Sequence, residues 1–196
     1  MEKGNAGGSD EKQADGGKKG PDKRRLYGII AAAGIVVVAL ILLLSSGGDD
    51  SADEPAAAAE VLSVEALGDA VSGQEPPVYW AGEQQGTEVE LSQPEAGRTY
   101  IRYLTDGAEA GDERADFLTV GTYAHTEPVA ALRKQGKEPG GVIATAPGGA
   151  TVYFSRKQPH SVYLAYPGLE AEIEVYDPNF TRALQLVNSG QIVPVG

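Results

Sequence analysis

Residues 170–176 read EAEIEVY, a strict alternation of acidic and apolar side chains that ends in a tyrosine. Because successive side chains of a β-strand point to opposite faces, this alternation predicts a strand. Ala171, Ile173 and Val175 would face a core, and the glutamates at 170, 172 and 174 would face water. We therefore expect a sheet that contains this strand as its most clearly patterned member.

Other segments of strand character lie between prolines and glycines on the N-terminal side of this run. They cover residues 78–80, 88–91, 99–104, 117–123, 142–146, 151–155 and 161–166. Most of the connections are too short for a helical crossover, so the strands should pair mainly in antiparallel fashion. Residues 93–97 predict the turn of a hairpin, and Gly121 suggests a β-bulge.

Short helices are expected over residues 63–72, over residues 127–135, and after Asp177. Ser63, Thr126 and Asp177 are the predicted N-caps, because their side-chain oxygens can accept a hydrogen bond from the first free N–H groups of a helix. These elements predict an α+β domain over residues 61–196. It would consist of a mostly antiparallel sheet with two or three short helices on one face.

Upstream of this domain the composition changes twice. Residues 1–25 are polar and basic, with too little apolar surface to fold, so a disordered cytoplasmic tail is predicted. Residues 26–44 contain no charge, and a helix of that length would be about 28 Å long, close to the thickness of the hydrocarbon core. This run predicts a transmembrane helix in contact with the lipid bilayer, and residues 45–60 predict a flexible acidic linker.

The charges that flank residues 26–44 predict the orientation of the anchor. Five basic residues between 18 and 25 precede it, and acidic residues follow it, so the N-terminus should be cytoplasmic. The chain would then be a single-pass plasma-membrane protein of the signal-anchor type, with its C-terminal domain outside. A buried core helix and a cleaved signal peptide are the alternatives. The signal peptide is disfavoured because its apolar region is shorter and closer to the N-terminus.

Composition also limits the chemistry that the chain can perform. The 196 residues include 28 Asp and Glu, 16 Lys and Arg, two His and no Cys, and the net charge is −12. So acidic a chain is not expected to bind nucleic acid, and without cysteine it has neither disulfides nor thiolate metal sites. No nucleotide-binding or serine-nucleophile motif is present. We expect no cofactor, no metal and no catalytic residue.

Three kinds of candidate site nevertheless merit a structural test. The acidic loop with Asp106, Asp112 and Asp116 would be a calcium site or a source of catalytic carboxylates, although its spacing does not match a known calcium loop. The two histidines, His125 and His160, lack metal-ligand spacing. A recognition surface is the third candidate, formed by Tyr79, Trp80, Tyr100 and Tyr103, because Tyr and Trp are enriched at interfaces. Packing within the sheet is the alternative role for these aromatic side chains.

Five segments give the chain a family resemblance: PVYWAG at 77–82, TYIRYL at 99–104, FLTVGTY at 117–123, VYLAYPG at 162–168 and EVYDP at 174–178. In these segments the chain resembles a group of uncharacterised single-pass envelope proteins of high-GC Gram-positive (actinobacterial-type) bacteria. The resemblance covers about residues 70–196. It implies the same layout of tail, anchor, linker and outer domain, and it brings no activity, cofactor or site residue.

The sequence therefore predicts a membrane-anchored, extracytoplasmic binding domain that is not an enzyme and whose partner is an envelope or membrane protein. Two alternatives remain open. One is a carboxylate-dependent envelope hydrolase or carbohydrate-active enzyme, and the other is a sensory or accessory subunit of a membrane complex.

Overall fold

A computed structural model describes residues 57–196 of the chain. The predicted tail, the predicted membrane segment at 26–44 and the linker up to residue 56 lie outside the described residues. Among residues 57–196, no helix is long and apolar enough to cross a membrane. The elements in chain order are β1 (Ala57–Leu62), α2 (Val64–Val71), β2 (Tyr79–Trp80), β3 (Glu88–Glu95), β4 (Arg98–Leu104), β5 (Leu118–Ala124), α3 (Pro128–Gln135), β6 (Gly141–Thr145), η2 (Pro147–Gly149), β7 (Thr151–Ser155), β8 (Gln158–Ala165), β9 (Ala171–Tyr176), α4 (Phe180–Asn188) and β10 (Val193–Pro194).

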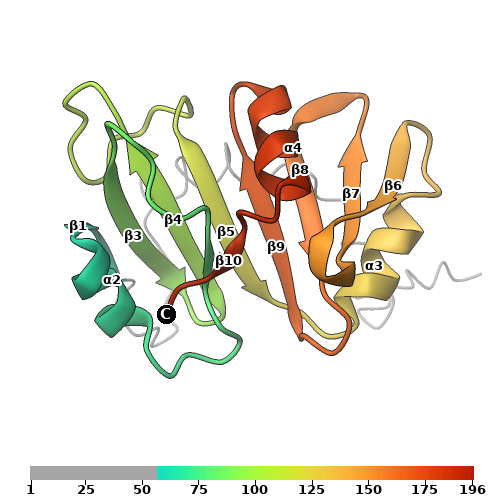
Figure 1. Ribbon diagram of the computed structural model, residues 1–196, viewed down its shortest axis with the longest axis horizontal. Helices are drawn as coiled ribbons and strands as arrows, with labels where there is room; N and C mark the ends of the chain where they lie inside the picture. Colours follow the sequence, from blue (N-terminus) through green and yellow to red (C-terminus); the bar gives the residue numbers. More distant parts are fainter. Residues whose placement is uncertain (1–56) are drawn as a thin grey trace, which may run out of the picture. The chain divides into compact units, whose positions relative to one another are not determined.

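Eight of these strands form one sheet in the order β1-β3-β4-β5-β9-β8-β7-β6 (Figure 1). Every neighbouring pair is antiparallel. The chain builds the sheet from both edges inward, because β3–β5 and β6–β9 are two meanders that meet at the β5–β9 pair. The expected α+β class and antiparallel sheet are confirmed. Strand β1 includes Ala57–Glu60, which the sequence had placed in the linker.

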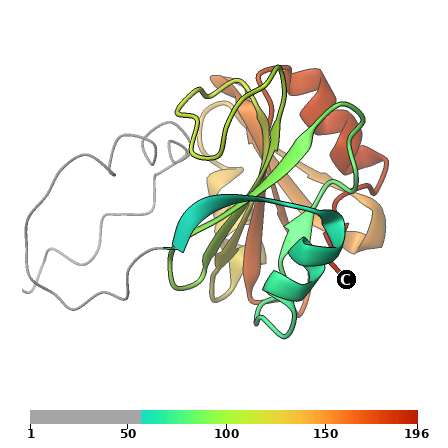
Figure 2. The same cartoon turned by 90° about the vertical axis from the view of Figure 1, so that its left-hand side faces the viewer.

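The larger core lies on one face of this sheet. Its strand residues include Ile101, Val120 and Ile173, all with no exposed surface. Helices α2 and α4 cover them through Leu67, Val71, Ala183, Leu186 and Val187. Figure 2 shows both helices on the same side of the sheet. A two-stranded ribbon of β2 and β10 completes this layer, and its Tyr79 N–H donates to the Thr122 hydroxyl of β5.

Helix α3 packs on the other face, so the expectation that all helices lie on one face was wrong. Its Leu132 is fully buried against Tyr163 and Ala165 of β8. These two residues alternate along the strand with Val162 and Leu164, which belong to the larger core. The connection from the central β5 to the edge strand β6 must cross the sheet, and here it crosses on the face that α2 and α4 leave open.

A buried ion pair organises the loop between β4 and β5 on this second face. Arg102 Nη1 lies 2.8 Å from Glu90 Oε1, and Glu90 is only 1% exposed. The second carboxylate oxygen of Glu90 accepts the Gly111 N–H at 2.6 Å, while Arg102 Nη2 donates to the Asp112 carbonyl. Both charges are therefore satisfied by hydrogen bonds, which is the condition for burying them at tolerable cost.

Only one of the three predicted N-cap residues occupies the N-cap position of its helix. Ser63 caps α2 as predicted, because its hydroxyl accepts the Ala66 N–H at 3.2 Å. Thr126 does not cap α3; Glu127 occupies the N-cap in a left-handed conformation, with no side-chain hydrogen bond. Asp177 is not the cap of α4 either. Asn179 takes that position, and the Asp177 carboxylate instead accepts the Asn179 N–H at 2.7 Å, which shapes the turn before the helix.

Gly121 is not a bulge, because it pairs in register with Tyr100 on one side and Glu174 on the other. Its role is to leave space. A Cβ atom at this position would lie 2.7 Å from the Tyr123 hydroxyl oxygen and 2.9 Å from Cζ of the same ring. The Tyr123 side chain therefore lies over Gly121, where only a residue without a side chain fits.

We predict that Gly121→Ala destabilises the domain by roughly 1–3 kcal/mol, because the added methyl group collides with the Tyr123 ring, whose hydroxyl is held by Glu174. Gly68→Ala is the matched control. Gly68 lies inside α2 with open space around it, so alanine there should be neutral or stabilise by up to about 1 kcal/mol. Urea unfolding of both variants measures the difference, and equal effects would contradict the role assigned to Gly121.

Candidate functional site

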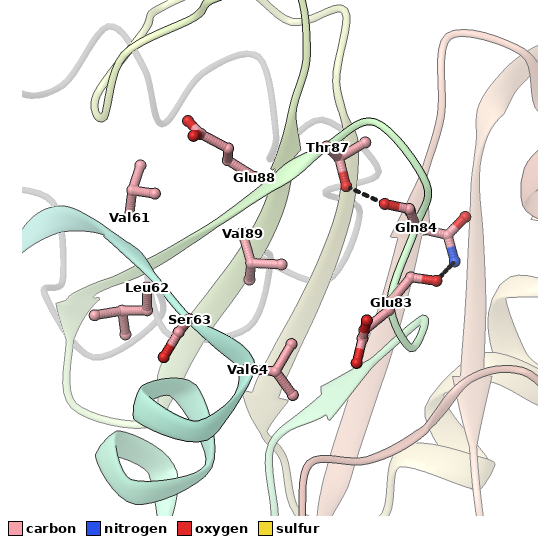
Figure 3. Close-up of a pocket in the computed structure, with 9 residues that line it drawn as sticks. All are labelled: Val61, Leu62, Ser63, Val64, Glu83, Gln84, Thr87, Glu88 and Val89. Atoms are coloured by element: carbon pink, nitrogen blue, oxygen red, sulfur yellow. Dashed lines mark hydrogen bonds between the residues drawn. The ribbon is translucent and has the colours of Figure 1, made fainter.

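A groove of about 380 Å³ lies at the β1 edge of the sheet. It is lined by nine residues from two segments, namely Val61, Leu62, Ser63, Val64, Glu83, Gln84, Thr87, Glu88 and Val89. Figure 3 shows one side formed by the corner between β1 and α2 and the other by the loop that leads into β3. The groove is open to solvent and combines aliphatic side chains with two glutamates.

Both sides of the groove are fixed by interactions outside it. The Ser63 cap fixes the direction in which α2 begins, and the buried Leu67 anchors that helix to the core. On the other side, Gln84 Nε2 donates to the Ala81 carbonyl at 2.8 Å, and Gln84 Oε1 accepts from Arg182 of α4 at 3.0 Å. The groove is therefore preformed, which lowers the entropic cost of binding.

The two segments that line the groove carry charge of a single sign. Residues 57–97 contain eight Asp and Glu and no Lys, Arg or His. Five of these acids are exposed near the groove or on its helix: Glu60, Glu65, Asp69, Glu83 and Glu88. Val61 and Val64 in the groove are each 38% exposed, and they are two of the four most exposed large aliphatic side chains among the described residues. An apolar centre with an acidic rim suits a cationic partner that also carries apolar groups.

The four residues of the predicted recognition surface do not lie together. Tyr103 is 1% exposed in the larger core, where its hydroxyl accepts the Ala81 N–H at 2.7 Å. Tyr79 is buried on the same face and stacks on Tyr166 at 5.6 Å between ring centroids. Trp80 is half-buried beside this core. Tyr100 is buried on the opposite face. Packing within the sheet accounts for the three tyrosines.

A cluster of tyrosines and glutamates lies at the centre of the second face. Glu174 of β9 is 2% exposed, so it does not face water as its alternation predicted. Tyr123 donates to Glu174 Oε2 at 2.6 Å, and Tyr163 donates to Glu174 Oε1 at 3.2 Å. Burial, together with the negative charge of Glu174, raises the pKa of Tyr123 and of Tyr163 well above the usual value. Both hydroxyls therefore stay protonated and remain donors.

Glu172 is the second glutamate of this cluster, and its surroundings disfavour the charged form of its carboxyl group. It lies two residues from Glu174 on the same face of β9 and opposite Tyr123 of β5. Burial, with a smaller contribution from the neighbouring charge of Glu174, raises the pKa of Glu172 to about 7. The nearby Tyr100 hydroxyl is buried, has no hydrogen-bond partner, and has a pKa raised by burial. Both oxygens of Glu174 are occupied by tyrosines, so this carboxylate is not free to act on a substrate.

The acidic loop at 105–116 is held by its own arginine. Arg114 makes hydrogen bonds of 2.9–3.1 Å with both carboxylate oxygens of Asp112 and lies 3.8 Å from Asp116. These contacts with Arg114 lower the pKa of Asp112. No group of three or more acidic or histidine side chains in residues 57–196 is arranged to hold a metal.

The two histidines are far apart. The His125 N–H donates to the Glu170 carbonyl just before β9, and the His160 carbonyl accepts from Asp177 just after it. The length of β9 thus separates them by roughly 20 Å, too far to share a ligand.

Sequence reasoning missed the groove, since its nine residues come from segments that are about 20 positions apart. A feature of the sequence that points to the groove is the segment 57–97, which contains acidic side chains and no basic ones.

We predict that Glu172→Gln stabilises the domain at pH 8 by roughly 1–3 kcal/mol. The raised pKa means that the folded protein retains a proton which the unfolded chain has already lost between about pH 4.5 and 7. Stability from this group is therefore full below about pH 4.5 and is lost as the pH rises through 7. The gain in the variant should vanish near pH 4.5.

Urea unfolding of both proteins across this pH range checks the expectation. Glu170→Gln is the control, because Glu170 is exposed just before the same strand and its replacement should change little at any pH. A pH-independent gain in Glu172→Gln would contradict the assignment.

The chain matches no protein-family model. No curated protein and no solved structure is similar to it either. The resemblance to single-pass envelope proteins therefore stays a prediction.

Proposed function

We propose that this protein is a membrane-anchored binding protein whose extracytoplasmic domain takes a cationic protein partner in the groove at the β1 edge. The groove carries the proposal, because it is preformed, is rimmed by Glu83 and Glu88, and exposes Val61 and Val64. The net negative charge of the whole domain also favours a positively charged partner, since residues 57–196 contain nine Lys and Arg against nineteen Asp and Glu.

The anchor is the second part of the proposal. It rests on the uncharged run at 26–44 and on the basic residues that precede it. These features favour a cytoplasmic N-terminus and a domain outside the membrane. The chain enters β1 at Ala57, so the proposed tether joins the domain at the same edge of the sheet as the groove. A partner held there would be kept close to the membrane.

The geometry gives less support to an enzyme. Glu174 is enclosed by two tyrosines, and Asp112 is held by Arg114, so the most distinctive carboxylates already have partners. Glu83 and Glu88, the two acids that line the groove, are both exposed. A sensory or accessory role would be a particular use of the proposed binding groove rather than a competing chemistry.

We predict that a photo-reactive amino acid placed at Val64 of the full-length protein crosslinks to a protein partner in cells. Val193 provides the matched control, because it is 40% exposed, compared with 38% for Val64, and does not line the groove. The charge reversals Glu83→Lys and Glu88→Lys should reduce the Val64 adduct at least about tenfold, since a cationic partner would then be repelled.

Crosslinked products are identified by mass spectrometry after denaturing purification. Adducts that form equally from Val64 and Val193, or that survive the reversal of both glutamates, would overturn the proposed binding site.

A further inference from the structure

The domain has a second charged end that the groove does not use. Five basic residues, Arg133, Lys134, Lys137, Arg156 and Lys157, lie between positions 133 and 157, with a single acid, Glu138. All five are exposed. They come from the end of α3, the residues after it, and the turn between β7 and β8. The Arg156 N–H donates to the Gly140 carbonyl at 2.9 Å, which holds the turn against the α3–β6 connection.

Among the basic residues of the described domain, these five form no ion pair with another described residue. The other four basic residues of the described domain, Arg98, Arg102, Arg114 and Arg182, each form an ion pair with a carboxylate. Within residues 57–196, no ion pair involves any of the five. Unpaired cations gathered on an acidic protein are available to an anionic partner.

An exposed apolar side chain accompanies this basic end, as it does the acidic one. Ile143 of β6 is 42% exposed and is the most exposed large aliphatic residue described. It lies beside the basic residues, because its Cγ1 occupies the space next to Gly136, one residue before Lys137. Each end of the domain thus combines exposed aliphatic surface with charge mainly of one sign, and the two predominant signs are opposite.

The two ends lie at opposite edges of the sheet. Strand β1 is one edge and β6 is the other, with six strands between them (Figure 1). At about 4.8 Å per strand the edges are roughly 34 Å apart, so the ends cannot neutralise each other within one copy.

We propose that the cationic partner of the groove is the basic end of a second copy of this chain, so that the domains associate head to tail. The inference rests on the proposed function, because it names the occupant of the same groove. Charge complementarity supports it: the acidic groove and the basic end carry opposite charges and apolar side chains of similar size. A modest affinity is enough under the proposed anchor, because confinement to one membrane raises the effective concentration.

The test uses two full-length copies expressed together, one with the photo-reactive residue at Val64 and one with an epitope tag. The expected product is an adduct with the mass of two chains. Arg133→Glu, Lys134→Glu and Lys137→Glu together in the tagged copy should reduce this adduct at least about tenfold. So should Glu83→Lys with Glu88→Lys in the photo-reactive copy. Combining both sets should restore the adduct, since the complementary charges are then exchanged.

Glu109→Lys with Glu113→Lys is the control, because both glutamates are exposed on the 105–116 loop, outside the groove. This change should leave the adduct intact. A Val64 adduct with a different protein would overturn the self-association and uphold the proposed groove, whereas no Val64 adduct at all would overturn both. An adduct that survives the basic-end reversal would also overturn the inference, and loss of binding to anionic vesicles in that variant would assign the basic end to lipid.

Discussion

The pairing of β5 with β9 is the interaction on which the rest of this fold depends. Six residue pairs join the two strands, between positions 119–124 and 171–176. The meander β3–β5 and the meander β6–β9 each contain only neighbouring hairpins, so this one contact between distant segments turns them into a single sheet. A long-range pairing of this kind closes a large loop and is costly in chain entropy. Both faces of the β5–β9 pair are covered, one by the larger core and the other by the tyrosine–glutamate cluster.

The cluster reinforces the same junction with polar contacts. Tyr123 on β5 donates to Glu174 on β9, and Tyr163 on β8 donates to the same carboxylate. One buried acid therefore connects three neighbouring strands across the centre of the sheet. Such a network specifies the register of the strands, because a slip by one residue would turn Glu174 into the apolar core and leave both hydroxyls without a partner.

All strands except β1 and β10 could be predicted from the sequence, but which of their acids face water could not. Alternation located β9 and the β3–β4 hairpin correctly, since apolar residues at every second position mark the face of a core. The same alternation predicted water around Glu174, which is buried, and Glu90 of β3 is buried as well. An alternating pattern shows that the two faces of a strand differ in polarity. It does not show which residues from other segments cover the polar face. Here Arg102 and two tyrosines, each remote in sequence from the acid it meets, provide the cover.

The start of α4 and the groove likewise depend on contacts that a sequence pattern does not reveal. Ser63 caps α2 through a contact three residues away, which sequence reasoning reaches, whereas the start of α4 depends on a turn that Asp177 shapes. No motif predicts the groove. Its aliphatic and acidic residues at 61–64 and 83–89 are separated in sequence, and they form one site only after β1 pairs with β3. The tyrosines predicted as a surface are buried for a related reason: Tyr100 and Tyr103 lie on β4, whose two faces are both covered, and Tyr79 packs against the larger core.

The uneven distribution of charge has a consequence for how the protein is detected. Trypsin cleaves after Lys and Arg, and the sequence has neither between Arg25 and Arg98. A tryptic digest therefore releases the predicted membrane segment and the whole groove as one peptide spanning residues 26–98, too long and too apolar for routine peptide mapping. Amine-reactive labels likewise find no lysine there. Proteases that cleave at acidic residues have eight sites in residues 57–97 alone, and they are the reagents that would make this end of the molecule visible.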